Sequence, residues 1–197
     1  MSFKIGKRIE IFRSTETIHA DNADERIPII LGTGRAFGSG DHETTASCLE
    51  ELERIPIIEN SKVLDVGCGT GVLSIAAVKL GARLVTALDP SPHAIKVTEE
   101  SIALNKMENK IVPVEGELKL VNDQNYDIIS ANLYGDILLT LMDDMQTRLK
   151  PGGYLLLSGI LYEYAFDLKR ALEHAGCDLL KARYLEEYVT LTARKRN

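Results

Sequence analysis

The spacing of hydrophobic residues changes several times along the chain, and the changes predict alternating strands and helices. Short apolar runs are typical of buried strands, whereas apolar residues that recur every three or four positions form one face of a helix. After residue 61, the predicted strands are about 63–66, 84–88, 111–114, 126–131, 154–157, 178–184 and 187–193. The predicted helices between them are about 72–80, 92–105, 138–149 and 165–175.

This alternation predicts an α/β fold. Repeated strand–helix units with almost continuous apolar strands form a mostly parallel sheet that helices cover on both faces. The last two strands leave no room for a helix between them, so they are expected to form an antiparallel hairpin. We therefore predict a seven-stranded, mostly parallel sheet with an antiparallel hairpin at its C-terminal end.

The first forty residues follow a different pattern. Residues 8–13 alternate between polar and apolar side chains, as a half-buried strand does, and residues 32–41 contain four glycines. A helix face begins just afterwards, and Asp41 stands where its N-cap is expected. We predict one compact domain, in which residues 1–41 supply strands and a loop over the ligand and residues 42–197 form the main body.

Composition and charge narrow the functional classes. The chain has 197 residues, of which 45% are hydrophobic and 26% charged, as in ordinary globular proteins. Its net charge of −6 argues against general electrostatic binding to nucleic acid or to an anionic membrane. Three cysteines without a C-x-x-C pair indicate neither a disulfide framework nor a zinc site, and the charged N-terminus lacks the apolar core of a signal peptide. A cytoplasmic protein without a metal is expected.

The first candidate site is a glycine-rich turn, Asp65-Val66-Gly67-Cys68-Gly69-Thr70-Gly71, between a predicted strand and a predicted helix. An open parallel sheet binds its ligand at such a turn, and glycines let the ligand approach the backbone. A loop that binds the pyrophosphate of NAD or FAD has the spacing G-x-G-x-x-G. Here Val72 occupies the third position, so the spacing weakly disfavours a dinucleotide.

An acidic residue follows at the end of the next predicted strand. Asp89 lies 18 residues after Gly71, and a carboxylate at this place accepts hydrogen bonds from both hydroxyls of a ribose. The alternative is purely structural: Asp89 caps the following helix, and Gly67–Gly71 only form a turn. The combination of loop, carboxylate and strand–helix context favours a nucleoside site.

These residues resemble a known family. Residues 63–71 together with Asp89-Pro90 are similar to the class I S-adenosylmethionine-dependent methyltransferases, which have a Rossmann-like fold. Within that class, Ala36–Thr45 (A-F-G-S-G-D-H-E-T-T) is similar to the A-F-G-T-G-x-H-x-T-T signature of the PrmA type. Ala131-Asn132-Leu133 and Lys150–Leu161 resemble two further PrmA motifs, A-N-I/L and K-P-G-G…L-S-G-I-L.

The PrmA type methylates amino groups of the eleventh large-subunit ribosomal protein. The resemblance therefore implies S-adenosylmethionine as the cofactor, S-adenosylhomocysteine as its product and a protein substrate, with no expected contact to nucleic acid or membrane. It implies cofactor contacts at Thr45, Gly67, Asp89 and Asn132, and a place for adenine near residues 115–117. The complete set of predicted cofactor residues is Phe37, Thr45, Asp65, Gly67, Cys68, Gly69, Gly71, Asp89, Pro90, Gly116, Glu117 and Asn132.

Methyl transfer to an amine requires a neutral amine, although free lysine has a pKa of about 10.4. An apolar pocket lowers that pKa and favours the reactive lone pair. Asn132 is the predicted catalytic residue, because its side-chain oxygen or a neighbouring carbonyl would accept an N–H and aim the lone pair; the alternative is a simple turn residue. Phe37 is either a lid or loop packing, His42 either a base or a helix cap, and Tyr134 either lines the acceptor site or packs.

Two departures from the PrmA pattern bear on the substrate. PrmA proteins carry an additional N-terminal domain that recognises the ribosomal protein, and this chain is expected to begin after it. Leu133-Tyr134-Gly135 replaces the usual I-L-A beside the expected acceptor pocket. The alternative function is therefore a methyltransferase that acts on a small molecule or on a different protein. A cofactor-binding module without turnover and an NAD-dependent enzyme are the alternatives from other classes, and the sequence predicts no oligomeric state.

Overall fold

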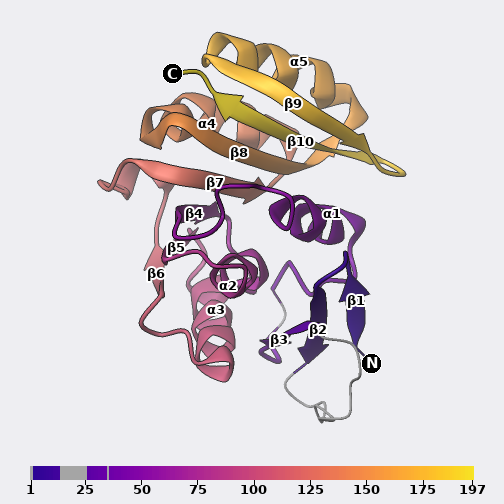
Figure 1. Ribbon diagram of the computed structural model, residues 1–197, viewed down its shortest axis with the longest axis vertical. Coiled ribbons are helices and arrows are strands. Elements are labelled where there is room, and N and C mark those ends of the chain that lie inside the picture. Colours follow the sequence, from indigo (N-terminus) through magenta and orange to yellow (C-terminus); the bar gives the residue numbers. More distant parts are fainter. Residues whose placement is uncertain (1, 14–25, 35) are drawn as a thin grey trace.

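The computed structural model describes residues 2–13, 26–34 and 36–197. Its centre is a seven-stranded sheet with the strand order β6-β5-β4-β7-β8-β10-β9 (Figure 1). Neighbouring strands from β6 to β8 run parallel, whereas β10 is antiparallel to both β8 and β9. The predicted α/β fold with its C-terminal hairpin is confirmed. The strands are β4 (Lys62–Val66), β5 (Leu84–Asp89), β6 (Ile111–Glu115), β7 (Tyr126–Asn132), β8 (Leu149–Leu161), β9 (Cys177–Tyr184) and β10 (Tyr188–Lys195).

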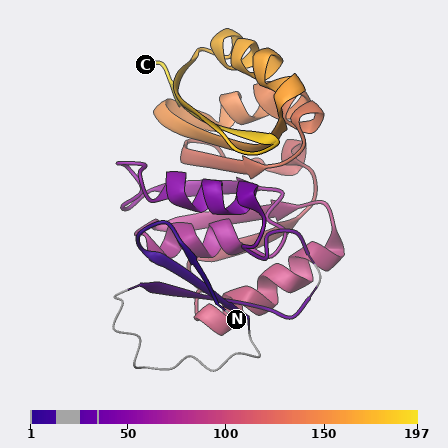
Figure 2. The ribbon, with the colours of Figure 1, turned by 90° about the vertical axis from the view of Figure 1, so that its right-hand side faces the viewer.

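Helices cover both faces of this sheet (Figures 1 and 2). One face carries α1, α2 and α3, and the other carries α4 and α5. A short 3-10 helix, η1, follows β6. The helices are α1 (Glu43–Leu52), α2 (Val72–Lys79), α3 (Pro92–Asn105), η1 (Leu118–Leu120), α4 (Gly135–Arg148) and α5 (Tyr162–His174).

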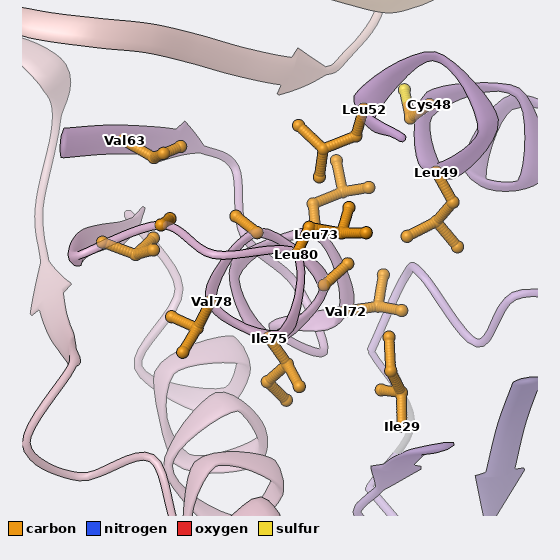
Figure 3. Close-up of a cluster of buried hydrophobic side chains, with 14 of the residues drawn as sticks. Ile29, Cys48, Leu49, Leu52, Val63, Val72, Leu73, Ile75, Val78 and Leu80 are labelled. Atoms are coloured by element: carbon orange, nitrogen blue, oxygen red, sulfur yellow. The ribbon is translucent and has the colours of Figure 1, made fainter. Parts of the chain in front are cut away.

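Successive residues of the central strands point into opposite apolar layers. Val63 of β4 belongs to the cluster that contains residues of α1 and α2, whereas Leu64 belongs to the cluster formed with α4 and α5. Figure 3 shows part of the first cluster, in which Leu49 of α1 and Val72 of α2 lie close to Ile29. Strands that are buried on both faces require such continuous apolar runs, and this requirement made them recognisable in the sequence.

The N-terminal residues form a second, three-stranded sheet. β1 (Phe3–Ile5) pairs antiparallel with β2 (Ile9–Arg13), and β2 pairs in parallel with β3 (Ile27–Leu31). The sequence pattern predicts β2 but neither β1 nor β3. Asn105 of α3 fixes β3, because its Oδ1 accepts from the backbone N–H of Ile30 at 3.1 Å and its Nδ2 donates to the carbonyl of Ile30 at 2.6 Å.

The small sheet and the large sheet share an apolar cluster. Ile11 and Ile29 of the small sheet belong to the same cluster as Leu49 of α1. Of the predicted segment 1–41, residues 1, 14–25 and 35 lie outside the described residues, and the division at residue 41 stays a prediction. In the part of the chain that the structure describes, no helix has the length and apolar character needed to cross a membrane.

The N-cap of α1 differs from the prediction by one residue. His42, rather than Asp41, precedes the helix in an extended conformation, and its Nδ1 accepts from the backbone N–H of Thr44 at 3.3 Å. A side chain that accepts from the amide two residues ahead is the ordinary capping geometry. The prediction of Asp41 as N-cap is therefore wrong, and the helix-cap interpretation of His42 is confirmed.

The start of β8 also differs from the prediction. Leu149 was expected on the inner face of the preceding helix, but it is the first residue of β8 and pairs with Tyr126 of β7. Proline disfavours the helical conformation of the residue before it, so Pro151 keeps Lys150 extended. The helix therefore ends at Arg148, earlier than its apolar pattern indicates.

Candidate functional site

A cavity of about 480 Å³ lies at the carboxyl ends of the parallel strands, where an open α/β sheet binds its ligand. Its volume falls within the range of small-molecule sites. Two segments that are far apart in the sequence, 36–44 and 132–137, form much of its wall. The glycine turn, the junction of β5 with α3, Gly159 and Tyr188 complete the lining.

The glycine turn has a backbone that other residues rarely adopt. Gly67, Gly69 and Gly71 have φ angles of 73°, 56° and 78°, in the left-handed region that favours glycine. A Cβ atom on Gly69 would lie 2.3 Å from the backbone oxygen of Phe37. The turn is therefore bare because the segment before α1 passes directly against it.

Thr70 joins these two segments. Its backbone N–H donates to the carbonyl of Phe37 at 3.0 Å, and its Oγ1 donates to the carbonyl of Gly38 at 2.8 Å. Both bonds hold the segment that carries Phe37 beside the cavity, where the Phe37 ring is 56% exposed. This placement agrees with a residue that covers a ligand, although the ring also packs 5.5 Å from the ring of His42.

Asp89 lies at the end of β5 with 9% of its surface exposed, and it lines the cavity. Its Oδ2 accepts from the backbone N–H of Gly69 at 3.1 Å, and its Oδ1 accepts from that of Ser91 at 2.9 Å. The bond to Ser91 is the kind expected if Asp89 only caps the following helix, because it stabilises the backbone that leads into α3. Each carboxylate oxygen has a further lone pair, so Asp89 retains acceptor capacity toward the cavity.

Asp65 lies beneath the glycine turn and is fully buried. Its Oδ2 accepts from Ser74 Oγ of α2 at 2.6 Å, and its Oδ1 accepts from Ser130 Oγ of β7 at 2.9 Å. Burial raises the pKa of Asp65 from its ordinary value of 3.8 to about 6, although both serine bonds oppose the increase. Its side chain does not belong to the cavity lining; its two hydrogen bonds tie the end of β4 to α2 and β7.

The raised pKa of Asp65 predicts a pH-dependent stability. A carboxyl group whose pKa is higher in the folded state favours folding while it is protonated, and this contribution is lost as pH rises through the folded pKa. Between pH 4 and pH 7, we expect the free energy of unfolding of the parent to fall by about 2 kcal/mol relative to Asp65→Asn. Urea denaturation of both proteins at stepped pH measures the difference, and a difference that is independent of pH would contradict the assignment.

Asn132 ends β7 at the floor of the cavity. Its Nδ2 donates to Thr45 Oγ1 at 3.4 Å, while its Oδ1 is buried and finds no hydrogen-bond partner among the described residues. A Cβ atom on Gly159 would lie 3.1 Å from this oxygen and 2.5 Å from the carbonyl oxygen of Leu133. A buried acceptor without a partner is costly, so this atom indicates that a ligand supplies a donor here.

The ring of His42 connects three parts of the wall. It lies 5.5 Å from the ring of Phe37 and 5.3 Å from that of Tyr188, which begins β10. Nδ1 accepts from the amide of Thr44 at 3.3 Å and lies 2.8 Å from Thr44 Oγ1. These contacts with the first turn of α1 favour the interpretation of His42 as a helix cap.

The family model described as ribosomal protein L11 methyltransferase (PrmA) matches residues 2–196, almost the entire chain. The chain belongs to the PrmA family. The predicted resemblance is thereby confirmed.

Individual PrmA relatives agree with this membership. A ribosomal protein L11 methyltransferase of Staphylococcus aureus is 35% identical over 98% of this chain and 61% of its own length. One of Clostridium botulinum is 37% identical over 87% of this chain and 54% of its own length. The chain thus spans less than two thirds of the length of each of these relatives. The crystal structure of a ribosomal protein L11 methylase from Lactobacillus delbrueckii superposes with a TM-score of 0.90 at 29% identity, and covers 100% of this chain and 99% of that one.

The structure brings half of the predicted site residues of this PrmA-family chain together. Those that line the cavity are Phe37, Gly67, Gly69, Asp89, Pro90 and Asn132. Thr45 stands behind Asn132, and Gly116 donates its backbone N–H to the carbonyl of Asp89 at 3.0 Å. Cys68 lies 3.4 Å from Thr98 Oγ1, away from the lining.

Glu117 does not reach the cavity. It is exposed and forms an ion pair with Lys119 at 2.7 Å, so no contact of this structure supports a role in reading adenine. Asp65 and Gly71 contribute backbone shape and packing to the glycine turn rather than cavity surface.

Several lining residues were missed by sequence reasoning. One of them is Ile137, in the first turn of α4. Tyr134, for which the sequence left lining and packing open, does line the cavity. Gly159 stands inside the L-S-G-I-L motif, so the motif contained a signal for it. Tyr188 comes from the C-terminal hairpin and carried no local signal, because only the pairing of β10 with β8 places it there.

Proposed function

We propose that this chain transfers a methyl group from S-adenosylmethionine to amino groups of ribosomal protein L11 in the cytoplasm. The observation that carries the proposal is the meeting of three features in one cavity: the bare turn at Gly69, the carboxylate of Asp89 and the unpartnered Oδ1 of Asn132. Membership of the PrmA family supports the reaction and the choice of substrate.

The lining fits a nucleoside without phosphate groups. Asp89 presents a buried carboxylate with spare lone pairs, which suits the two hydroxyls of a ribose. The turn lacks the third glycine of the G-x-G-x-x-G spacing found in pyrophosphate-binding loops, since Val72 occupies that position. The cavity therefore suits a sulfonium nucleoside better than NAD.

When bound, S-adenosylmethionine supplies an activated methyl group. The residues of the chain have to align the acceptor amine and exclude water, which contributes several kcal/mol to catalysis. Leu133 and Ile137 give the cavity apolar surface, which favours the neutral form of an amine over the ammonium. Asn132 Oδ1 is buried at the floor and accepts an amine N–H, which fixes the direction of the nitrogen lone pair.

Replacement of Asp89 tests the cofactor part of the proposal. We expect Asp89→Ala to weaken S-adenosylhomocysteine binding by roughly 30- to 150-fold, because hydrogen bonds to a charged acceptor contribute about 2–3 kcal/mol. Glu117→Ala is the matched control, since it removes an exposed carboxylate of the same neighbourhood, and its affinity should stay within about threefold of the parent. Isothermal titration calorimetry measures both variants. Equal losses in the two variants, or tighter binding of NAD than of S-adenosylhomocysteine by the parent, would contradict the assignment.

Transfer of a radioactive methyl group tests the substrate. The chain is incubated with labelled S-adenosylmethionine and purified ribosomal protein L11, and the label is then located by gel electrophoresis. Label in L11 that depends on an intact Asp89 is the expected result. Label that enters only low-mass material of a cell lysate would instead favour the small-molecule alternative.

A further inference from the structure

The mouth of the cavity has an unusual charge distribution. Asp89 is the one carboxylate among the described lining residues, which include no lysine or arginine. Three segments that carry lining residues, 41–45, 132–137 and 184–188, contain carboxylates but no lysine or arginine. Farther from the cavity, Glu50 and Glu51 are paired with Arg54, Lys181 and Arg183.

Four carboxylates lie within two residues of a lining residue, and we call them the acidic rim: Glu43, Asp136, Glu186 and Glu187. Glu43 follows His42, Asp136 lies between Tyr134 and Ile137, and Glu187 precedes Tyr188. Asp136, Glu186 and Glu187 are exposed. Asp41 is left out of the acidic rim, because the hydroxyl of Ser39 donates to its carboxylate and this bond, with a smaller contribution from Arg13, lowers the pKa of Asp41.

Hydrogen bonds join two parts of the acidic rim. The carboxylate of Glu43 accepts from the backbone N–H groups of Glu186 at 3.1 Å and Glu187 at 3.4 Å. The ring of Tyr188 lies 5.3 Å from that of His42. These contacts join the turn between β9 and β10 to the start of α1.

Aromatic rings are exposed beside these carboxylates. Phe37 and Tyr134 line the cavity, yet 56% and 66% of their surfaces remain exposed. Large exposed rings at a mouth mark a binding surface, and a ring face attracts an ammonium or guanidinium group. Carboxylates and ring faces therefore favour the same chemical class of partner.

We propose that the acidic rim selects acceptor segments that carry lysines or arginines next to the methylated amine. The proposal rests on the proposed function and names the class of its protein substrate. Negative charge at the mouth attracts a cationic segment and speeds encounter, while the buried, unpartnered Oδ1 of Asn132 marks where the acceptor nitrogen comes to lie. The carboxylates of the acidic rim attract the cationic segment at the mouth, and the apolar lining of the cavity then favours the neutral form of the acceptor amine.

Two peptides and two charge-matched variants test the proposal. One labelled peptide carries a single lysine between arginines, and the other replaces those arginines with glutamines. Binding to the full chain in the presence of S-adenosylhomocysteine is followed by fluorescence anisotropy at low and high salt. The rim variant is Asp136→Asn/Glu186→Gln/Glu187→Gln, which leaves Glu43 and its backbone bonds intact.

The control variant is Glu59→Gln/Glu108→Gln/Asp143→Asn, which removes the same charge from exposed carboxylates outside the lining. We expect the rim variant to bind the arginine peptide about tenfold more weakly at low salt and to lose most of the salt dependence. The control variant should stay within about twofold, and both should keep the parent affinity for S-adenosylhomocysteine.

Three results would overturn the proposal: equal effects of the two variants, equal binding of the two peptides by the parent, or no binding of the arginine peptide. These outcomes are distinct from failure of the proposed function. A parent chain that binds S-adenosylhomocysteine and labels L11 but ignores peptide charge refutes the acidic rim alone. A parent chain that does not bind S-adenosylhomocysteine refutes the methyltransferase assignment.

Discussion

Gly69→Ala is expected to weaken S-adenosylhomocysteine binding more than 100-fold. Its Cβ would lie 2.3 Å from the carbonyl oxygen of Phe37, an atom that Thr70 already holds in a 3.0 Å hydrogen bond. The backbone of Gly69 also has a φ of 56°, which costs an L-residue about 1–2 kcal/mol. The segment that carries Phe37 and the turn must move apart, and the cavity wall moves with them. Calorimetry measures the affinity, and circular dichroism verifies the fold.

Gly176→Ala separates backbone strain from the steric effect. Gly176 has a φ of 70°, but a Cβ atom there would meet no described atom within 4 Å. It should therefore lower the melting temperature by about 2–8 °C and leave the affinity within about twofold of the parent. If Gly69→Ala behaves like Gly176→Ala, the contact between the turn and Phe37 does not shape the cavity.

Asn132→Ala is expected to reduce kcat for methyl transfer by about 100-fold or more, since a misplaced acceptor costs rate of this order. The variant removes the buried Oδ1 that lacks a partner within the described structure. The Kd for S-adenosylhomocysteine should change only a few-fold, because Gly69 and Asp89 hold the nucleoside. Initial rates at saturating cofactor, together with calorimetry, separate the two quantities.

Thr45→Val is the companion variant for this test. It removes the hydroxyl to which Asn132 Nδ2 donates at 3.4 Å but leaves Oδ1 in place. We expect kcat to fall by roughly 3- to 10-fold, because Asn132 keeps its acceptor but loses part of its orientation. Full turnover by Asn132→Ala would show that Asn132 does not orient the acceptor. A loss of affinity for S-adenosylhomocysteine without a loss of kcat would show that Asn132 holds the cofactor instead.

The sequence predicted the large sheet well because its strands are buried on both faces. Runs such as Val63–Val66 and Leu155–Leu157 have to be apolar at every position, except where a buried polar side chain finds a hydrogen-bond partner. Asp65 is such an exception, since Ser74 and Ser130 hydrogen-bond both of its oxygens. The burial of these strands could therefore be predicted from their apolar runs. The place of the site could also be predicted, because an open α/β sheet binds its ligand at the carboxyl ends of its strands.

Other parts depend on contacts that local patterns do not contain. β3 (Ile27–Leu31) is held by Asn105 of α3, more than seventy residues away, so its short apolar run gave no sign of a partner. Tyr188 reaches the cavity through strand pairing alone. Glu117 was placed near adenine because it comes just after β6, but its carboxylate pairs with Lys119 and lies outside the lining.

The tie between Thr70 and the segment before α1 also decides how short a working fragment can be. A fragment that started at Glu43 would retain every strand of the large sheet. It would lack both carbonyl acceptors of Thr70 and the histidine that caps its first helix. The shortest fragment that binds the ligand must therefore include the carbonyls of Phe37 and Gly38 and the side chain of His42. In a truncation series, we expect ligand binding to be lost before the large sheet unfolds.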